Sequence, residues 1–271
     1  MPSTEIKQTR IVGICQIRNE DVFIERVLTN ILDFCDSIIV ADHNSTDQTP
    51  SIVKRLAARE PKIKYSAVKY PGEAHELVRP YCNTPTWIFP VDGDELYDPH
   101  GLVRLRPGIL TGEFDHYRQF YGHSLHCTTI DFSAKTATGY MTPPCRTVTK
   151  LYNFGALEDW KGPCIEKCLG GRIIFNPGWT EESNYTILDQ FTWETSPFRL
   201  MHACFMKRSS LQEDNSSPTQ NIVEIYSATR LQKLRRWIAR LLGHPTSSRY
   251  KLDKYQRGPL AQYDASGFIP K

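Results

Sequence analysis

Three carboxylates crowd into the stretch 92–95 (DGDE), directly after the apolar run 86–91 (TWIFPV). Like charges this close repel one another, and at the rim of an apolar core they cost stability unless a cation neutralises them. Hard carboxylate oxygens suit Mg²⁺ or Mn²⁺, which commonly lie between protein carboxylates and the phosphates of a substrate. Gly93 lets the backbone turn tightly and lets a ligand approach closely. The stretch therefore predicts a divalent-metal site, with an acidic surface turn as the alternative.

The chain around this stretch alternates between strand and helix patterns. Short apolar runs predict strands at 11–17, 37–41, 62–68 and 86–91. Apolar residues at helical spacing predict helices at 21–34, 52–57 and 72–81. This alternation indicates right-handed βαβ units and a parallel sheet, which binds ligands at the carboxyl ends of its strands. Polar clusters follow three of these strands, at 18–20, 42–47 and 92–95.

Composition limits the class of protein. The chain has 271 residues, of which 40% are hydrophobic and 23% charged, enough for one large α/β domain or a domain with an appendage. The net charge of +3 gives no reason to expect a nucleic-acid partner. No run approaches the roughly 18 apolar residues of a spanning helix, and the first ten residues hold no apolar signal region. We therefore expect a cytoplasmic protein whose eight cysteines are reduced, mostly buried thiols.

Three ordered stretches resemble one known family. They are IVGICQIRNEDVFIERVL (11–28), IIVADHNSTDQT (38–49) and WIFPVDGDELYDP (87–99). Together they resemble the nucleotide-binding half of family 2 glycosyltransferases, over about residues 9–105. The resemblance implies a GT-A-type, Rossmann-like α/β fold: a parallel or mixed nucleotide-binding sheet flanked by helices. The chain departs from the usual pattern at 16–18, where Pro-x-Tyr is common, and at 43–44, where His-Asn replaces Asp-Gly.

The resemblance implies a metal-dependent, inverting transfer of sugar from a nucleoside-diphosphate sugar, a UDP-sugar, to a hydroxyl of a glycan or lipid-linked acceptor. The D-x-D-E ending resembles the subgroup that includes lipopolysaccharide-core and related bacterial enzymes. Asp94 and Asp92 would form part of a site for Mn²⁺ or Mg²⁺. Asp94 would bind the ion, and Asp92 would face the ribose or a metal-bound water.

Other positions line the expected donor pocket. Asn19 and Glu20 would shape the nucleoside pocket, and Asp42 would accept hydrogen bonds from the base edge. His202 would complete the metal or diphosphate site, although a lone histidine in an apolar stretch is more often part of the core. Asp47, Ser45 and Thr46 are better interpreted as helix-capping or loop residues.

An inverting transfer needs a carboxylate that takes the proton of the acceptor hydroxyl. By resemblance, the segment 162–166 (GPCIE) offers Glu166 as this base, with Ile165 where the subgroup has a histidine. The pair Glu158-Asp159 offers Asp159 as the second choice. The alternative interpretation of both Glu166 and Asp159 is an exposed carboxylate on the protein surface.

The remaining chain carries weaker signals. We divide the whole chain into a GT-A domain at 1–210 and a C-terminal loop, helix and tail at 211–271. The GT-A domain has a nucleotide-binding half at 1–105 and an acceptor-binding half at 106–210. The aromatic run 114–125 predicts strands beside the acceptor site, and 128–144, rich in Thr, Gly and Pro, predicts a loop. The basic amphipathic helix at 229–242 suits either packing on its own domain or peripheral contact with the inner face of a membrane.

Three other hypotheses compete. A nucleotidyltransferase would use the same carboxylates, but the Gly-rich phosphate loop expected after its first strand is absent from the sequence. A non-catalytic nucleotide-sugar-binding module would keep the fold and lack the base. A zinc site formed by Cys164, Cys168, His202 and Cys204 matches no standard ligand spacing.

Overall fold

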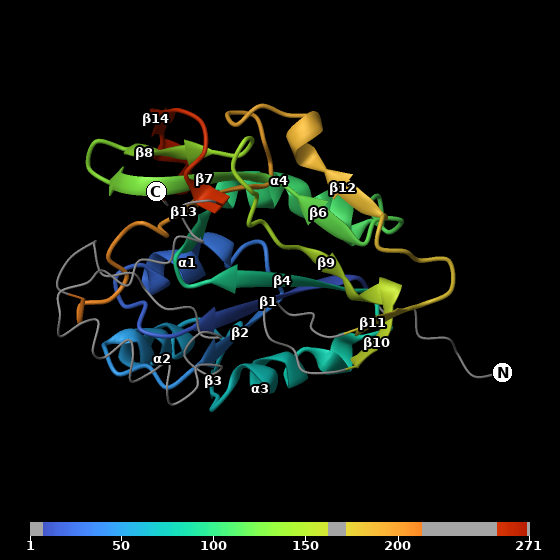
Figure 1. The fold of residues 1–271 in the computed structure, drawn as a ribbon. Coiled ribbons are helices and arrows are strands. Elements are labelled where there is room, and N and C mark those ends of the chain that lie inside the picture. The colour runs from blue at the N-terminus through green and yellow to red at the C-terminus, as the bar shows by residue number, and fades with distance from the viewer. Residues whose placement is uncertain (1–7, 162–171, 213–253, 270–271) are drawn as a thin grey trace, which may run out of the picture.

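A seven-stranded mixed sheet forms the centre of the protein (Figure 1). The computed structural model describes residues 8–161, 172–212 and 254–269. The strand order of the seven-stranded sheet is β12-β6-β9-β4-β1-β2-β3. The strands are β1 Arg10–Ile17, β2 Ser37–Asp42, β3 Ile63–Ala67, β4 Thr86–Asp92, β6 Gln119–Tyr121, β9 Tyr152–Asn153 and β12 Asn184–Thr186. Strands β1 to β4 are parallel, and β9 is antiparallel to both β4 and β6.

Both faces of the sheet are covered, which is why the central strands are apolar almost throughout. In β1, Ile11 and Cys15 face one core cluster, whereas Val12 and Ile14 face another. The first cluster includes side chains of α1 (Ile24–Ile31), α2 (Thr49–Ala57) and α4 (Pro99–Leu110). The second lies against the segment after α3 (Pro71–Glu76) and the hairpin of β10 (Leu157–Lys161) and β11 (Arg172–Phe175). Figure 1 shows α1 and α4 on one side of the sheet and α3 on the other.

The first four predicted strands and the first two helices are confirmed with small shifts of their ends. The third predicted helix, 72–81, is interrupted: α3 ends at Glu76, and a separate 3₁₀ turn covers Arg79–Tyr81. Pro80 lies in that turn, and a proline supplies no N–H for a continuous α-helix.

A second sheet of five strands, β14-β8-β7-β13-β5, packs beside the first. Its strands are β5 Glu95–Tyr97, β7 His123–Asp131, β8 Thr136–Met141, β13 Arg199–His202 and β14 Leu260–Asp264. Strand β13 is parallel to β7 and antiparallel to β5. It therefore lies between β7 and β5, and β5 begins at Glu95 of the acidic stretch.

The prediction of a loop at 128–144 is wrong. The end of β7 and all of β8 lie in this segment and pair in an antiparallel ladder. Gly139 is required by that packing, because a Cβ there would lie 2.4 Å from the carbonyl oxygen of His126. The glycine and threonine content that suggested a loop therefore reflects a tightly packed strand.

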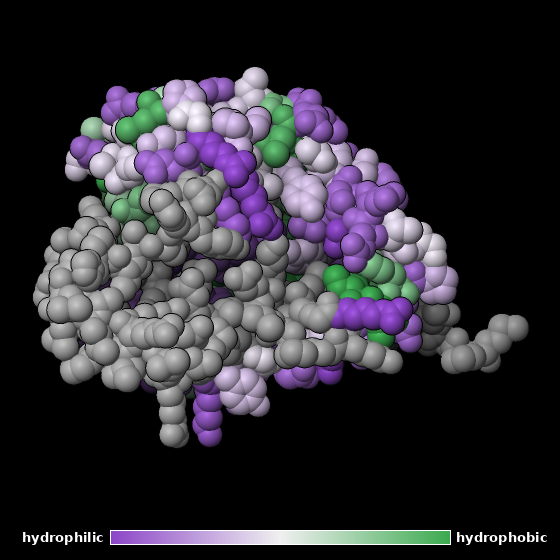
Figure 2. Space-filling model, in the orientation of Figure 1, coloured by the Kyte–Doolittle hydropathy of each residue, from purple (hydrophilic) through white to green (hydrophobic). Residues whose placement is uncertain are grey.

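The C-terminal segment that the structure describes contributes β14 to this second sheet, next to β8. The predicted basic helix at 229–242 lies outside the described residues, so the helical extension and the division at residue 210 stay predictions. No helix in the described ranges is long and apolar enough to cross a membrane. In the view of Figure 2, the described surface is mostly hydrophilic, with hydrophobic residues in small separate patches.

Candidate active site

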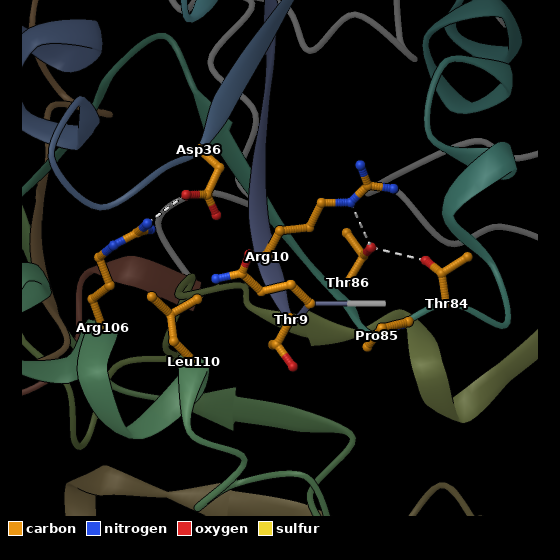
Figure 3. Close-up of a pocket in the computed structure, with 9 residues that line it drawn as sticks. Thr9, Arg10, Asp36, Thr84, Pro85, Thr86, Arg106 and Leu110 are labelled. Atoms are coloured by element: carbon orange, nitrogen blue, oxygen red, sulfur yellow. Dashed lines mark hydrogen bonds and ion pairs between the residues drawn. The ribbon is translucent and has the colours of Figure 1, made fainter. Parts of the chain in front are cut away.

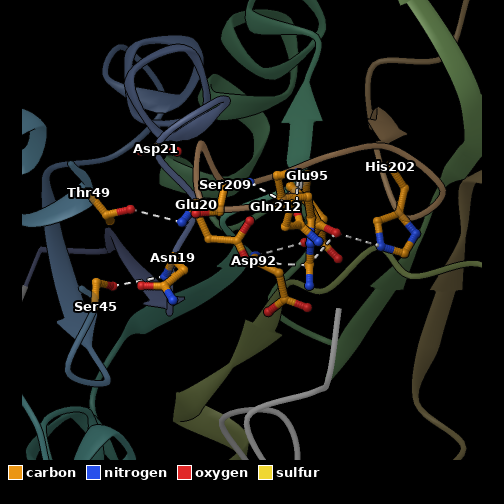
Figure 4. A network of polar contacts seen from close by, with 12 residues as sticks. Asn19, Glu20, Asp21, Ser45, Thr49, Asp92, Glu95, His202, Ser209 and Gln212 are labelled. Carbon is orange, nitrogen blue, oxygen red and sulfur yellow. Dashed lines mark hydrogen bonds and ion pairs between the residues drawn. The ribbon is translucent and has the colours of Figure 1, made fainter. Parts of the chain in front are cut away.

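Three loops meet at the carboxyl ends of β1, β2 and β4. The strand register places Gln16 beside Asp92 and Ile17 beside Asp42, so the predicted polar clusters are neighbours in space. Hydrogen bonds then join the first two loops: the backbone N–H of Asn19 donates to Ser45 Oγ (2.9 Å), and Asn19 Oδ1 accepts from the backbone N–H of Thr46 (2.7 Å). Figure 4 shows Asn19 beside Ser45, and Glu20 of the same loop on the side of Asp92.

Asp42 is buried and orders the loop after β2. Its Oδ1 accepts from the backbone N–H (2.9 Å) and the hydroxyl (2.6 Å) of Ser45, and its Oδ2 accepts from the Tyr65 hydroxyl (2.7 Å). Burial, together with this carboxylate, raises the pKa of Tyr65 to about 12. Asp47 accepts from the backbone N–H of Thr49 (2.9 Å) at the start of α2, in line with its interpretation as a helix-end residue. Both aspartates hold the loop in shape.

Gly93 is the point where the end of β4 approaches the loop after β1. A Cβ at this position would lie 2.5 Å from Cγ and 2.8 Å from Cβ of Glu20. Only glycine permits this approach without displacing Glu20. The carboxylates of Glu20 and of the D-x-D-E stretch are thereby brought into one cluster.

Two buried cations neutralise part of this cluster. Lys150 Nζ lies 2.8 Å from Asp92 Oδ2 and 3.1 Å from Glu95 Oε1. Arg208 Nη1 lies 2.6 Å from Asp94 Oδ2 and 3.3 Å from Glu20 Oε1. The set is Glu20, Asp92, Asp94, Glu95, Lys150 and Arg208. Among the described residues, four carboxylates against two cations leave two negative charges when all are ionised, which is the charge that one divalent ion would neutralise.

Burial is the largest single influence on the pKa values in this cluster, and the neighbouring charges add to it or oppose it. Burial raises the pKa of Glu95 to about 8, opposed by Lys150 and reinforced by Asp92 and Asp94. Burial alone would lower the pKa of Lys150, but the charges of Asp92 and Glu95 raise it. The pKa of Arg208 is raised for the same reason, by Asp94 and Glu20 against its burial. The ionised carboxylates therefore depend on cations held close to them.

His202, at the end of β13, lies against the same cluster. Its Nε2 is 3.6 Å from Asp94 Oδ2, and Figure 4 shows the ring directed toward the carboxylates. Its Nδ1 is 3.0 Å from Nδ1 of His126, whose Nε2 is 2.9 Å from the carbonyl oxygen of Arg146. Burial lowers the pKa of His126 to about 4. His202 thus lies beside Asp94 at the candidate site, and its role as a ligand stays a prediction.

These residues fit a divalent metal ion. Asp94 and His202 present an oxygen and a nitrogen 3.6 Å apart, and Asp92 is half exposed beside them. Carboxylate oxygens suit Mg²⁺ and Mn²⁺, and imidazole nitrogen is accepted by transition metals such as Mn²⁺. His126, His202 and Cys204 form a second group, whose ligand atoms lie within 4.8 Å of one another. Cys164 and Cys168 of the zinc hypothesis lie outside the described residues, and the six cysteines within them form no disulfide with one another.

The structure describes one of the two predicted bases, Asp159, and places it in the β10–β11 hairpin next to Arg79. Asp159 is part of the β10–β11 hairpin, and its Oδ1 lies 3.4 Å from Nε of Arg79 in the 3₁₀ turn after α3. Arg79 also donates to the carbonyl oxygen of Trp160 (2.9 Å). The backbone N–H of Asn83, just before β4, donates to the carbonyl oxygen of Leu157 in β10 (2.8 Å), so the hairpin begins near the amino end of β4. Glu166 lies outside the described residues. Both assignments stay predictions.

Sequence reasoning missed Lys150, Arg208 and His126. Lys150 stands in the segment KLYNF, and Arg208 follows His202 by six residues, but neither position has a local pattern that assigns it to the carboxylates. His126 belongs to an alternating strand, where the histidine is one buried position among several. Only the pairing of β13 with β7 brings it opposite His202.

A cavity of about 480 Å³ lies away from this site. Figure 3 shows Arg10, Thr86 and Arg106 among its lining residues, at the amino ends of β1 and β4. Arg10 donates to Thr86 Oγ1 (3.2 Å), and Arg106 pairs with Asp36. The cavity is therefore at the opposite end of the strands from the candidate site, and its arginines are engaged with the protein.

A comparison with models of known protein families identifies the family of the chain. The sequence model described as "Glycosyl transferase family 2" matches residues 14–214, and the chain belongs to this family. The GT-A-type α/β fold expected from the sequence is confirmed. No curated protein matches the chain.

Three solved structures are similar over part of the chain. One is the mannosyltransferase PcManGT from Pyrobaculum calidifontis in complex with GDP-Man and Mn²⁺ (21% identity, 43% of this chain, 36% of that chain, TM-score 0.34). Another is glucosyl-3-phosphoglycerate synthase from Mycobacterium tuberculosis (20%, 44%, 44%, 0.29). A third is 4-diphosphocytidyl-2C-methyl-D-erythritol synthase from Anaerococcus prevotii (12%, 54%, 70%, 0.35). The chain thus spans less than half the length of the first two.

Proposed function

We propose that the protein is a metal-dependent glycosyltransferase that moves a hexosyl group from a nucleoside-diphosphate sugar to a hydroxyl of a glycan or lipid-linked acceptor, with inversion. Family membership supports glycosyl transfer. The observation that supports the metal dependence is Asp94 Oδ2 facing His202 Nε2 at 3.6 Å, within a cluster whose described residues include four carboxylates and two cations. A UDP-sugar is the proposed donor.

In this proposal Asp92, Asp94 and His202 hold Mn²⁺ or Mg²⁺. When bound, the ion supplies Lewis-acid stabilisation of the departing nucleoside diphosphate. Lys150 and Arg208 would hold the carboxylates in place, because each cation spans two of them.

The nucleoside lies beside the loops after β1 and β2. Asn19 and Glu20 shape its pocket, and Asp42 recognises the edge of the base. The hydrogen bonds of Asp42 to Ser45 and Tyr65 support a rigid loop for that recognition.

The base is a carboxylate that accepts the acceptor's hydroxyl proton while that oxygen bonds to the anomeric carbon and the bond to the diphosphate breaks. Glu166 is the first candidate and Asp159 the second. Asp159 is paired with Arg79, so it would act in this role only after that pair opens.

The acceptor and the location are proposed from the sequence alone. The D-x-D-E ending favours polysaccharide or lipopolysaccharide synthesis in the cytoplasm. The basic stretch 229–242 favours peripheral contact with an anionic membrane that carries the acceptor.

A thermal-shift screen of nucleoside-diphosphate sugars with and without Mn²⁺, followed by assays of donor hydrolysis and transfer, tests the proposal. Asp94→Ala should abolish the Mn²⁺ dependence of nucleotide affinity in a folded protein. Asp42→Ala is the matched control, because it should weaken donor binding while Mn²⁺ affinity changes little. A folded Asp94→Ala variant with unchanged Mn²⁺ dependence would refute the metal assignment, and binding without hydrolysis or transfer would favour a non-catalytic module.

A further inference from the structure

His126 has one ring nitrogen whose role is set by the backbone. Its Nε2 lies 2.9 Å from the carbonyl oxygen of Arg146, and the residue is fully buried in β7. A carbonyl oxygen can only accept a hydrogen bond, so Nε2 of His126 carries the proton. In the neutral ring, Nδ1 is then the acceptor.

The role of His126 sets that of His202. The two Nδ1 atoms are 3.0 Å apart, and since His126 accepts at Nδ1, His202 donates from its own Nδ1. The lone pair of a neutral His202 is thereby assigned to Nε2. That atom is the one 3.6 Å from Asp94 Oδ2.

We propose that His126 is a positioning residue that fixes the ring orientation and tautomer of His202, so that His202 presents its Nε2 lone pair beside Asp94 to a divalent ion. This inference rests on the metal-dependent function proposed above. A histidine that binds a metal commonly donates its second ring N–H to a fixed acceptor, which orients the ring and raises its basicity. Here a second imidazole, itself held by a backbone carbonyl, provides that acceptor.

The packing around both rings supports a fixed geometry. The parallel pairing of β13 with β7 places His202 directly opposite His126. The ring of Tyr255 stacks on His126 with centroids 4.4 Å apart and meets His202 edge-on at 5.3 Å. Tyr255 therefore packs against both imidazoles, and the pairing of β7 with β13 holds the two rings opposite each other.

A different arrangement would follow if the ligand group were His126, His202 and Cys204. A metal bound by both Nδ1 atoms and the Cys204 thiolate would need lone pairs on both Nδ1 atoms, and His202 would then carry its proton on Nε2. The two arrangements require opposite tautomers of His202. The tautomer therefore decides between them.

The first test measures that tautomer by long-range ¹H–¹⁵N NMR on the metal-free, unmodified, full-length protein with ¹⁵N-labelled histidine. We expect the Nδ1–H form of His202 and the Nε2–H form of His126. An Nε2–H form of His202 would overturn the proposal, and a zinc ion copurifying in stoichiometric amount and lost with Cys204→Ser would replace it with the thiolate site. This measurement needs no variant to fold.

The second test compares Mn²⁺ affinity, measured by EPR of free Mn²⁺, in two variants. In His126→Asn the amide oxygen can accept from Nδ1 of His202, whereas His126→Leu has similar bulk and no acceptor. We expect His126→Leu to weaken Mn²⁺ binding roughly 10–100-fold and His126→Asn to retain most of it. Equal affinities in the two variants would refute the positioning role alone. Failure of the unmodified protein to bind Mn²⁺ would instead refute the proposed metal-dependent function.

Discussion

Replacing Arg208 with methionine tests the charge balance of the site directly. The guanidinium contacts Asp94 at 2.6 Å and Glu20 at 3.3 Å, and the three side chains are 10%, 2% and 7% exposed. Methionine preserves much of the aliphatic bulk of arginine but removes the charge. Of the described residues, Asp94 and Glu20 would then lose the cation that contacts both of them, and Lys150 would be the one remaining described cation in the cluster.

The size of the effect follows from this geometry. Two unit charges about 4 Å apart at an effective dielectric constant of about 20 interact by roughly 4 kcal/mol. Breaking a buried ion pair by removing one partner costs about 3–5 kcal/mol. A domain of this size loses about 2–4 °C in melting temperature for each kcal/mol, so Arg208→Met should melt roughly 6–20 °C lower without metal.

Mn²⁺ should restore much of this loss, because the ion takes over the compensation of Asp94. The assay is thermal unfolding by circular dichroism, with and without Mn²⁺, on the unmodified protein and on two variants. The matched control is Arg199→Met. Arg199 Nη2 lies 2.8 Å from Asp98 Oδ2, and these side chains are 12% and 2% exposed, but Asp98 caps the start of α4 and the pair is not part of the carboxylate cluster.

We expect Mn²⁺ to raise the melting temperature of Arg208→Met by more than that of the unmodified protein, and to leave the loss in Arg199→Met uncorrected. Equal Mn²⁺-induced shifts in all three proteins would refute the reasoning, because the ion would then bind without relieving the uncompensated carboxylates. A melting temperature of Arg208→Met equal to that of the unmodified protein would also contradict it.

Three further predictions address the base, the pH dependence and the membrane. Glu166→Gln should leave donor binding intact and lower transfer by about 10²–10⁴-fold, with a smaller loss in Asp159→Asn; the reverse order, by kinetic assay, moves the base to Asp159. Burial, with His43 nearby, lowers the pKa of His75 from 6.5 to about 4, so the unfolded chain alone takes up this proton as pH falls between those values. Stability is therefore lost in that window, by up to about 3 kcal/mol, and urea unfolding of His75→Gln should show a flatter pH profile. The stretch 229–242 should carry the protein onto anionic vesicles at low salt, with release as salt rises; absence from the vesicle pellet at low salt excludes this contact.

Short runs of neighbouring residues predicted the strands and the acidic stretch, because each of these features depends on residues adjacent in the sequence. A buried parallel strand requires a continuous apolar run, and β1, β2 and β4 each have one that ends in polar residues. The carboxyl ends of parallel strands share one edge of the sheet, so the loops after them were expected together, and the structure confirms this. The loop prediction at 128–144 failed because β8 is a strand of small and polar residues, stabilised by its ladder with β7 and β14 rather than by its own apolar pattern.

The sequence by itself determined the family and the fold class and predicted a metal-binding stretch, because each depends on residues close together in the chain. Only the tertiary structure decided which cations and rings meet those carboxylates. Lys150, Arg208 and His126 come from segments far from Asp94 in the chain, and no periodicity relates them to it. The physical reason is that an ion pair or a hydrogen bond depends on separations of about 3 Å in space. Those separations are set by the order and register of the strands, through which β13 brings His202 between β5 and β7.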